Sequence, residues 1–214
     1  MASENALFPV EESPEFIQES EERDNQYRYT VAWDVEKGDF ILDGKNRMET
    51  CNGMEGYKVC VYAIAKDEAK FAARWAESMG EADAVYVLDT GSSDDTVKIL
   101  QAHGVNVRSE IITPWRFDAA RNRSLELVPE DADICVCTDI DEVLHPGWRA
   151  AAEKAWSNGA DMLRYRYTWN FNEDGSEGTV FYIDKIHARH GFKWVNPVHE
   201  VLEYELSLIH ISEP

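Results

Sequence analysis

Residues 58–104 read KVCVYAIAKDEAKFAARWAESMGEADAVYVLDTGSSDDTVKILQAHG, and this stretch decides the fold. The short apolar runs at 58–65 and 82–89 have the length and the β-branched content of buried strands. Between them, apolar residues recur at helical spacing until a glycine ends the pattern. Strand and helix therefore alternate, which predicts a parallel sheet because parallel strands need crossover connections.

The alternation continues toward the carboxyl end of the chain. It predicts further helices at 97–104, 117–128 and 146–158, and further strands at 105–112 and 132–141. Beyond residue 159 the pattern becomes aromatic and β-branched, in two segments joined by the turn-forming sequence NEDGSEG. The predicted fold class is α/β, with a Rossmann-like, mostly parallel sheet flanked by helices and a β-rich second half. Ligands of such sheets bind at the carboxyl ends of the strands.

The chain is expected to form one domain, because 214 residues support a single sizeable core. Residues 1–50 are interpreted as an acidic leader, flexible at 11–26, followed by a short extension or edge hairpin near 27–40. Residues 51–205 form the predicted domain. This domain is a candidate for truncation at its carboxyl end, where an acceptor-binding tail would follow. Residues 206–214 fit neither strand nor helix and are assigned to a non-core tail.

The composition excludes several classes of partner. Asp and Glu number 41 against 21 Lys and Arg, a net charge of −20. Such a chain repels DNA and RNA, since polyanion binding needs clustered cations. No signal peptide and no run of about 18 apolar residues is found, so we expect a cytoplasmic protein without a transmembrane segment.

The segment ICVCTDIDEV at 134–143 runs from a buried strand directly into acidic residues. Side chains two apart share a face of an extended chain, so Asp139 and Asp141 are expected to point toward one ligand. Carboxylate oxygens suit Mg²⁺ or Mn²⁺, which take further ligands from substrate phosphates. The alternative is a solvated loop whose acids cap a helix.

Three other segments place polar residues where they can meet this pair. Asp89 ends the second strand. There it is expected to contact a base or ribose, and the alternative is that it only stabilises the turn. Arg121 lies early in the third helix, where it orders an acid or phosphate or else forms a surface ion pair. His199 and Glu200 offer a metal ligand and a general base, although such a pair is usually structural.

Five segments resemble, in order and spacing, the successive motifs of family 2 glycosyltransferases of the GT-A fold. They are VCVYAIAKDEAKF (59–71), VLDTGSSDDT (87–96), FDAARNRSLE (117–126), CTDIDEVLHPGW (137–148) and WVNPVHE (194–200). The resemblance covers residues 57–202. It implies a hexosyltransferase that takes a nucleotide-diphosphate sugar as donor, uses Mn²⁺ or Mg²⁺ as cofactor and inverts the sugar in a single displacement.

The resemblance also implies roles for individual side chains. Those implied in nucleotide binding are Glu68, Asp89, Arg121 and Asp139. Those implied in metal binding are Asp139, Asp141 and His199.

Glu200 is the candidate catalytic base, which would deprotonate the acceptor. Many family members use an Asp within a Glu-Asp dipeptide, which is absent from the expected region here, so this assignment is the least fixed. The acceptor is left open among a glycan, a lipid and a protein.

Two other functions compete with this interpretation. TDIDEV also resembles the nucleophile loop of haloacid-dehalogenase-like phosphatases, in which Asp139 would attack phosphorus. That loop normally follows the first core strand, whereas three strands precede it here. A non-catalytic nucleotide-sugar-binding protein is the second alternative. A sugar-nucleotide pyrophosphorylase fits less well, because AKDE stands where a glycine-rich loop is expected.

Overall fold

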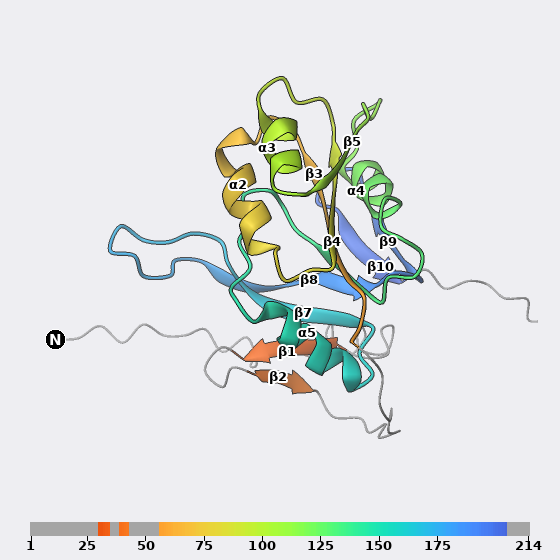
Figure 1. The fold of residues 1–214 in the computed structure, drawn as a ribbon. Helices are drawn as coiled ribbons and strands as arrows, with labels where there is room; N and C mark the ends of the chain where they lie inside the picture. The colour runs from red at the N-terminus through yellow and green to blue at the C-terminus, as the bar shows by residue number, and fades with distance from the viewer. Residues whose placement is uncertain (1–29, 35–38, 43–55, 205–214) are drawn as a thin grey trace, which may run out of the picture.

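The computed structural model describes residues 30–34, 39–42 and 56–204. The leader expected at 11–26 and the tail expected at 206–214 lie outside these residues. The described residues form an eight-stranded sheet, four helices and a separate two-stranded sheet (Figure 1). The predicted α/β class is confirmed.

The eight-stranded sheet has the order β2-β1-β7-β8-β6-β3-β4-β5, and β9 pairs with β10 in the smaller sheet. The strands are β1 (Thr30–Asp34), β2 (Asp39–Leu42), β3 (Val59–Ala65), β4 (Ala84–Asp89), β5 (Asn106–Ser109), β6 (Ile134–Cys137), β7 (Met162–Thr168), β8 (Val180–Ala188), β9 (Phe192–Val195) and β10 (Val201–Tyr204). The strands β6, β3, β4 and β5 are mutually parallel.

Strands β7 and β8 of the β-rich second half belong to the same sheet as the parallel strands. Strand β8 pairs antiparallel with both β6 and β7, so it joins the parallel strands to the rest of the sheet. Strand β1 pairs parallel with β7 and antiparallel with β2. The hairpin predicted near residues 27–40 is therefore present, as β1 and β2 at one edge of the sheet.

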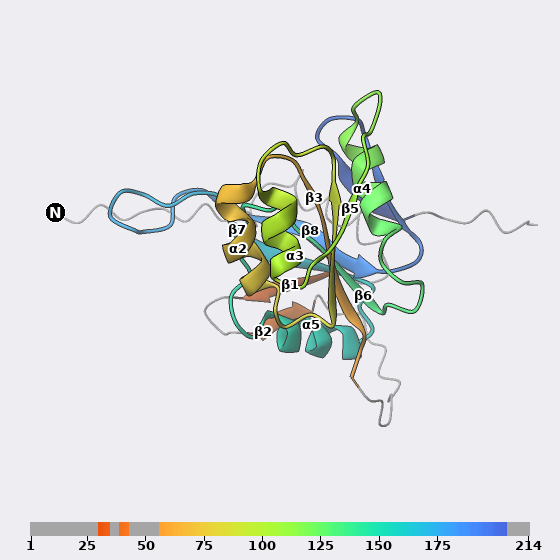
Figure 2. The same ribbon diagram turned by 45° about the horizontal axis from the view of Figure 1, so that its top comes forward.

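Helices cover both faces of the parallel strands. The helices are α2 (Ala69–Ser78), α3 (Thr96–Ala102), α4 (Phe117–Leu125) and α5 (Trp148–Ser157). Side chains of α2, α3 and α5 pack on one face, and α4 packs with β9 and β10 on the other (Figure 2). Alternate residues of β3 supply both layers, Val61 to the first and Tyr62 to the second.

The reversal of direction at β3 creates the crevice that a ligand needs. The chain leaves β3 through α2 toward β4, whereas it reaches β6 through α4 on the opposite face. Strands that continue in opposite directions from a common starting strand leave a gap between their loops at the carboxyl edge. Figure 1 shows α2 and α4 on either side of β3. The longest described helix has only 10 residues, and none is suited to cross a membrane.

A buried polar triad lies in the second core layer. The Tyr62 hydroxyl is 2.8 Å from His187 Nε2 and accepts a hydrogen bond of 2.7 Å from Trp194 Nε1. His187 is fully buried, and its Nδ1 lies 2.8 Å from the carbonyl oxygen of Ala188. From the sequence, His187 is interpreted as an ordinary polar residue. The structure shows instead that it belongs to a hydrogen-bonded triad that joins β3, β8 and β9.

We expect His187 to make the free energy of unfolding depend on acid pH. Burial lowers the pKa of His187 to about 4 in the folded state, whereas the unfolded value is about 6.5. The unfolded chain therefore binds the proton first, and stability present above about pH 6.5 is lost as the pH falls toward about 4. Urea unfolding between these limits should show a steeper loss for the parent than for His187→Gln, and equal slopes would contradict this assignment.

Candidate functional site

A pocket of about 380 Å³ opens at the carboxyl edge of the parallel strands. Its walls come from the segments that follow β3, β4 and β6, from α4 and from the turn before β10. The lining residues are Ile64, Ala65, Lys66, Glu68, Thr90, Phe117, Arg121, Asp139, Ile140, Asp141 and Glu200. This is the edge at which the sequence predicts a ligand.

The loops that follow β3 and β4 are fastened to each other. The backbone N–H of Thr90 donates to the carbonyl of Ala65 at 2.8 Å, and that of Glu68 donates to Thr96 Oγ1 at 2.7 Å. Asp94 accepts from the N–H of Thr96 at 2.9 Å and from that of Ala69 at 3.1 Å, so it connects the starts of two helices. These bonds fix the wall that carries Glu68.

The opposite wall is fastened through α4. The amide of Asn122 exchanges two hydrogen bonds of 2.8 Å with the backbone of Trp194 in β9. The N–H of Phe117 donates to the carbonyl of Pro197 at 3.0 Å. Because the start and the middle of α4 hold the β9–β10 hairpin, Glu200 is brought to the pocket from a distant part of the sequence.

Arg121 is the centre of this wall. Its side chain is only 4% exposed, and its guanidinium lies 5.4 Å from the centre of the Trp194 ring. Nε donates to Glu200 Oε1 at 3.0 Å, and one terminal nitrogen donates to Asp139 Oδ1. The surface ion pair considered as an alternative is therefore excluded, because this guanidinium is buried between two carboxylates.

Asp139 is held by a second cation. Lys185 Nζ donates to Asp139 Oδ2 at 2.9 Å and to Glu142 Oε1 at 2.7 Å. Glu142 also accepts from the N–H of Asp139 at 3.0 Å. Burial alone would raise the pKa of Asp139, but the charges of Arg121 and Lys185 outweigh it and hold that pKa well below its usual range.

Asp141 and Glu68 form an acidic rim on the pocket. Asp141 is exposed, and Arg74 donates to its backbone carbonyl at 2.9 Å, which leaves the carboxylate outside that bond. Burial raises the pKa of Glu68, and the carboxylates of Asp141, Asp94 and Asp139 raise it further. The carboxylates that cause this shift repel one another, and a bound cation relieves that repulsion.

Negative charge exceeds positive charge in the pocket as a whole. We name Arg121, Asp139, Glu142, Lys185 and Glu200 the charge cluster, which holds two cations and three carboxyl groups. The two rim acids raise the carboxyl groups to five, and Lys66 in the lining raises the cations to three. Internal pairing therefore leaves carboxylates in excess, and these face the space where a ligand would lie.

Two predicted site residues lie apart from the pocket lining. Asp89 is buried, and its Oδ1 accepts from the N–H of Ser92 at 3.1 Å, as expected for a residue that stabilises a turn. His199 is exposed and has a φ of 56°. The backbone turns at His199, so the chain brings Glu200 into the pocket lining and leaves His199 outside it.

The side chains in the pocket suit a metal ion that takes some of its ligands from substrate phosphates. Within the described ranges, no three His, Cys, Asp or Glu side chains are grouped to hold an ion by themselves. The predicted ligand trio of Asp139, Asp141 and His199 is therefore not assembled, because Asp139 is paired with two cations and His199 faces outward. Magnesium commonly takes only one or two carboxylates together with substrate phosphates, and Asp141 and Glu68 supply carboxylates of that kind.

Lys185, Glu142, Thr90 and Phe117 belong to the site but were missed in the sequence. Glu142 directly follows the predicted pair, so its acidity was a visible signal. Lys185 lies in a strand that the sequence predicts, but its contact with Asp139 depends on the pairing of β8 with β6, which no local pattern reveals.

We expect Lys185→Met to destabilise the fold. The change leaves the buried Glu142 and the half-buried Asp139 without their shared cation, and the loss of one partner of a buried ion pair such as Lys185–Glu142 costs about 3–5 kcal/mol. Chemical denaturation measures the free energy of unfolding. Lys98→Met is the matched control, since Lys98 is exposed and lies 3.7 Å from Asp95; it should change stability by less than about 0.5 kcal/mol. Similar values for both variants would show that the Lys185 contacts contribute little.

Comparisons with known proteins find similar chains among solved structures. No protein-family model matches the sequence, and no curated protein matches it. Among solved structures, glucosyl-3-phosphoglycerate synthase of M. tuberculosis matches with 27% identity over 49% of this chain and 42% of that one, at a TM-score of 0.42. TarS of S. aureus matches with 19% identity over 50% of this chain and 21% of that one, at a TM-score of 0.44.

One structure of the mycobacterial enzyme is described as a complex with Mn²⁺, uridine diphosphate and glucosyl-3-phosphoglycerate, and matches with 28% identity over 39% of this chain and 33% of that one, at a TM-score of 0.35. The present chain thus spans less than half the length of these structures. Each of these structures matches about half of this chain or less.

Proposed function

We propose that the chain is a metal-dependent, inverting glycosyltransferase of the hexosyltransferase class. The observation that carries this proposal is the pocket itself, where acidic side chains gather on one rim and a buried arginine–glutamate pair lines the opposite wall. A nucleotide-diphosphate sugar needs a cation for its diphosphate and a base for its acceptor. Both requirements have candidate residues in this pocket, and the motif resemblance supplies the donor class.

The proposed metal residue is Asp141, with Glu68 as the neighbouring acid. A bound Mn²⁺ or Mg²⁺ would neutralise the negative charge that develops on the departing nucleoside diphosphate. Arg121 is assigned to order Asp139, which it holds from within the protein wall. Asp139 in turn is assigned to the ribose side of the donor, since both of its oxygens already accept from cations.

Glu200 is the proposed catalytic base. In the reaction, an acceptor hydroxyl oxygen bonds to the anomeric carbon as the bond from that carbon to the diphosphate oxygen breaks. The hydroxyl proton passes to Glu200, and the nucleoside diphosphate leaves with the bonding electron pair. Arg121 binds Oε1 of Glu200 and so orients the carboxylate toward the pocket. The transferred sugar inverts because one displacement occurs.

The phosphatase alternative fits this geometry less well. A carboxylate that attacks phosphorus needs an oxygen free to approach it. Both oxygens of Asp139 accept from buried or half-buried cations. A non-catalytic nucleotide-sugar-binding protein would use the same pocket, and turnover of the donor distinguishes it from an enzyme.

We expect Asp141→Asn to weaken metal-dependent nucleotide binding at least about tenfold, because a charged oxygen ligand becomes a neutral amide. Thermal unfolding with UDP, GDP or CMP, each with and without Mn²⁺, should show joint stabilisation of the parent by one nucleotide with the metal. Asp95→Asn is the control, because Asp95 is exposed at the start of α3. An unchanged metal-dependent shift in Asp141→Asn would remove Asp141 from the metal site.

We expect Glu200→Gln to lower donor turnover about 10²- to 10⁴-fold, the usual contribution of a positioned base. Nucleotide and Mn²⁺ binding should persist, because the amide oxygen still accepts from Arg121. Steady-state turnover and thermal shift measured on the same preparation separate these effects. Glu77→Gln, at an exposed position on α2, should resemble the parent. Full turnover in Glu200→Gln would assign the base to another residue.

A further inference from the structure

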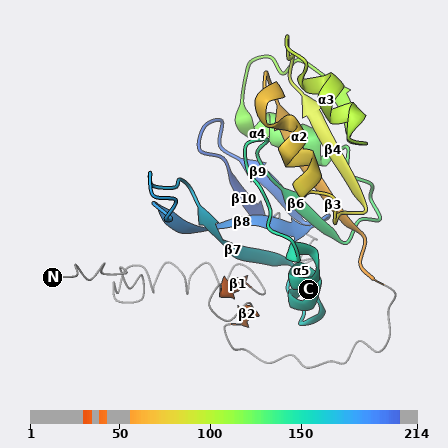
Figure 3. The same ribbon diagram turned by 60° about the vertical axis from the view of Figure 1, so that its left-hand side comes forward.

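An arm of the sheet carries exposed aromatic side chains. Residues 167–182, at the ends of β7 and β8 and in their connection, project from the body in all three ribbon views (Figures 1, 2 and 3). We name Tyr167, Trp169 and Phe181 the aromatic strip. Their ring centres lie 5.3 to 6.2 Å apart, and Trp169 is 67% exposed. Large rings left uncovered in this way mark a binding surface.

The aromatic strip lies at the ends of two strands that also carry a residue of the charge cluster. Tyr167 and Phe181 are paired across β7 and β8, and Lys185 follows Phe181 by four residues along β8, at a bulge where the register shifts. Lys185 holds Asp139 of the charge cluster. Burial raises the pKa of Tyr167, and the charges of Glu142, Asp141 and Asp139 raise it further. Strand β8 therefore joins the strip to the charge cluster.

We propose that the aromatic strip binds a carbohydrate acceptor by stacking its pyranose rings. This inference rests on the proposed function and names the acceptor class. The C–H groups on one face of a pyranose are weakly positive, and the face of an aromatic ring is negative, so the two surfaces attract. Trp169 and Phe181, which are 67% and 38% exposed, offer rings of this kind to a ligand.

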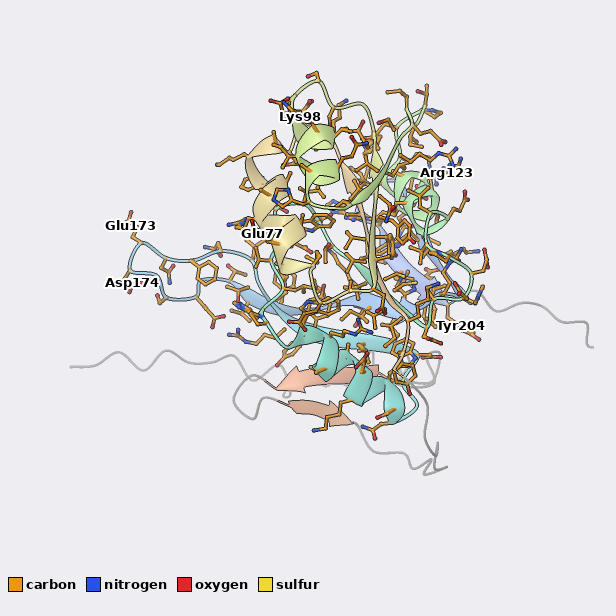
Figure 4. All side chains as sticks on the ribbon, in the orientation of Figure 1. Glu77, Lys98, Arg123, Glu173, Asp174 and Tyr204 are labelled. Carbon is orange, nitrogen blue, oxygen red and sulfur yellow. The ribbon has the colours of Figure 1, made fainter. Side chains whose placement is uncertain are left out.

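Charge distinguishes a neutral sugar chain from other occupants of this surface. Glu173 and Asp174 lie at the tip of the arm (Figure 4), and the chain carries a net charge of −20. An anionic bilayer would meet like charge at this tip, and so would a second copy of the chain. An uncharged glycan meets no such repulsion, while its hydroxyl groups can donate to these carboxylates.

The test measures oligosaccharide and nucleotide binding separately. Calorimetric titration with neutral cello-, malto-, chito- and manno-oligosaccharides should show that the parent binds at least one series. Trp169→Ala and Phe181→Ala should each weaken that binding about tenfold, as expected for one lost stacking contact. Tyr182→Ala is the matched control, because Tyr182 is an exposed aromatic on the opposite face of β8, and it should bind as the parent does.

The stabilisation by nucleotide with Mn²⁺ should be the same in all four proteins. If the parent binds nucleotide and none of the four oligosaccharide series, the acceptor inference is overturned while the proposed function stands. If oligosaccharides bind and no nucleotide does, the proposed function fails instead. Sedimentation and anionic-vesicle binding complete the test: a loss of self-association or of vesicle binding in Trp169→Ala, without an effect on oligosaccharides, would assign the strip to one of those partners and overturn the inference.

Discussion

The ion pairs of Arg121 hold together three parts of the chain that are far apart in sequence. Its guanidinium, on α4, binds Asp139 after β6 and Glu200 before β10. A buried cation is tolerated only when it is paired and hydrogen-bonded, since desolvation costs several kcal/mol for an isolated charge. The two carboxylates meet this requirement. The positions of a predicted nucleotide residue and of the predicted base are thereby set by one side chain.

This arrangement divides the work of the two aspartates. The Asp139-x-Asp141 motif does not distinguish its two acidic residues, but the fold places them in different surroundings. Asp139 is enclosed between Arg121 and Lys185, whereas Asp141 is exposed on the rim. A carboxylate that already accepts from two cations is a poor direct ligand for a third. The motif therefore supplies one positioned acid and one open acid, and only the open acid matches what a metal shared with phosphate requires.

Local pattern predicted most of the fold. The apolar runs and the helical spacing in 58–104 correspond to β3, α2, β4 and α3, because each element there buries one side on the sheet. The predicted strand at 105–112 is shorter in the structure and ends at Ser109. The joining of β8 to β6 could not be predicted, since strand order depends on packing between distant segments. His187 was underestimated for the same reason, because its partners Tyr62 and Trp194 lie on other strands.

Five of the seven predicted site residues line the pocket, and the two that do not share a cause. Asp89 and His199 were placed by their position in a motif, as were the others, but the direction of a side chain depends on the turn that bears it. Asp89 accepts a hydrogen bond within its own turn, and His199 has a left-handed backbone. Lys185 was missed for the converse reason, because no motif surrounds it and its importance comes from β8 lying beside β6. Strand β8 thus joins the two halves of the proposed enzyme, with a cation beside the donor pocket at one end and the aromatic strip at the other.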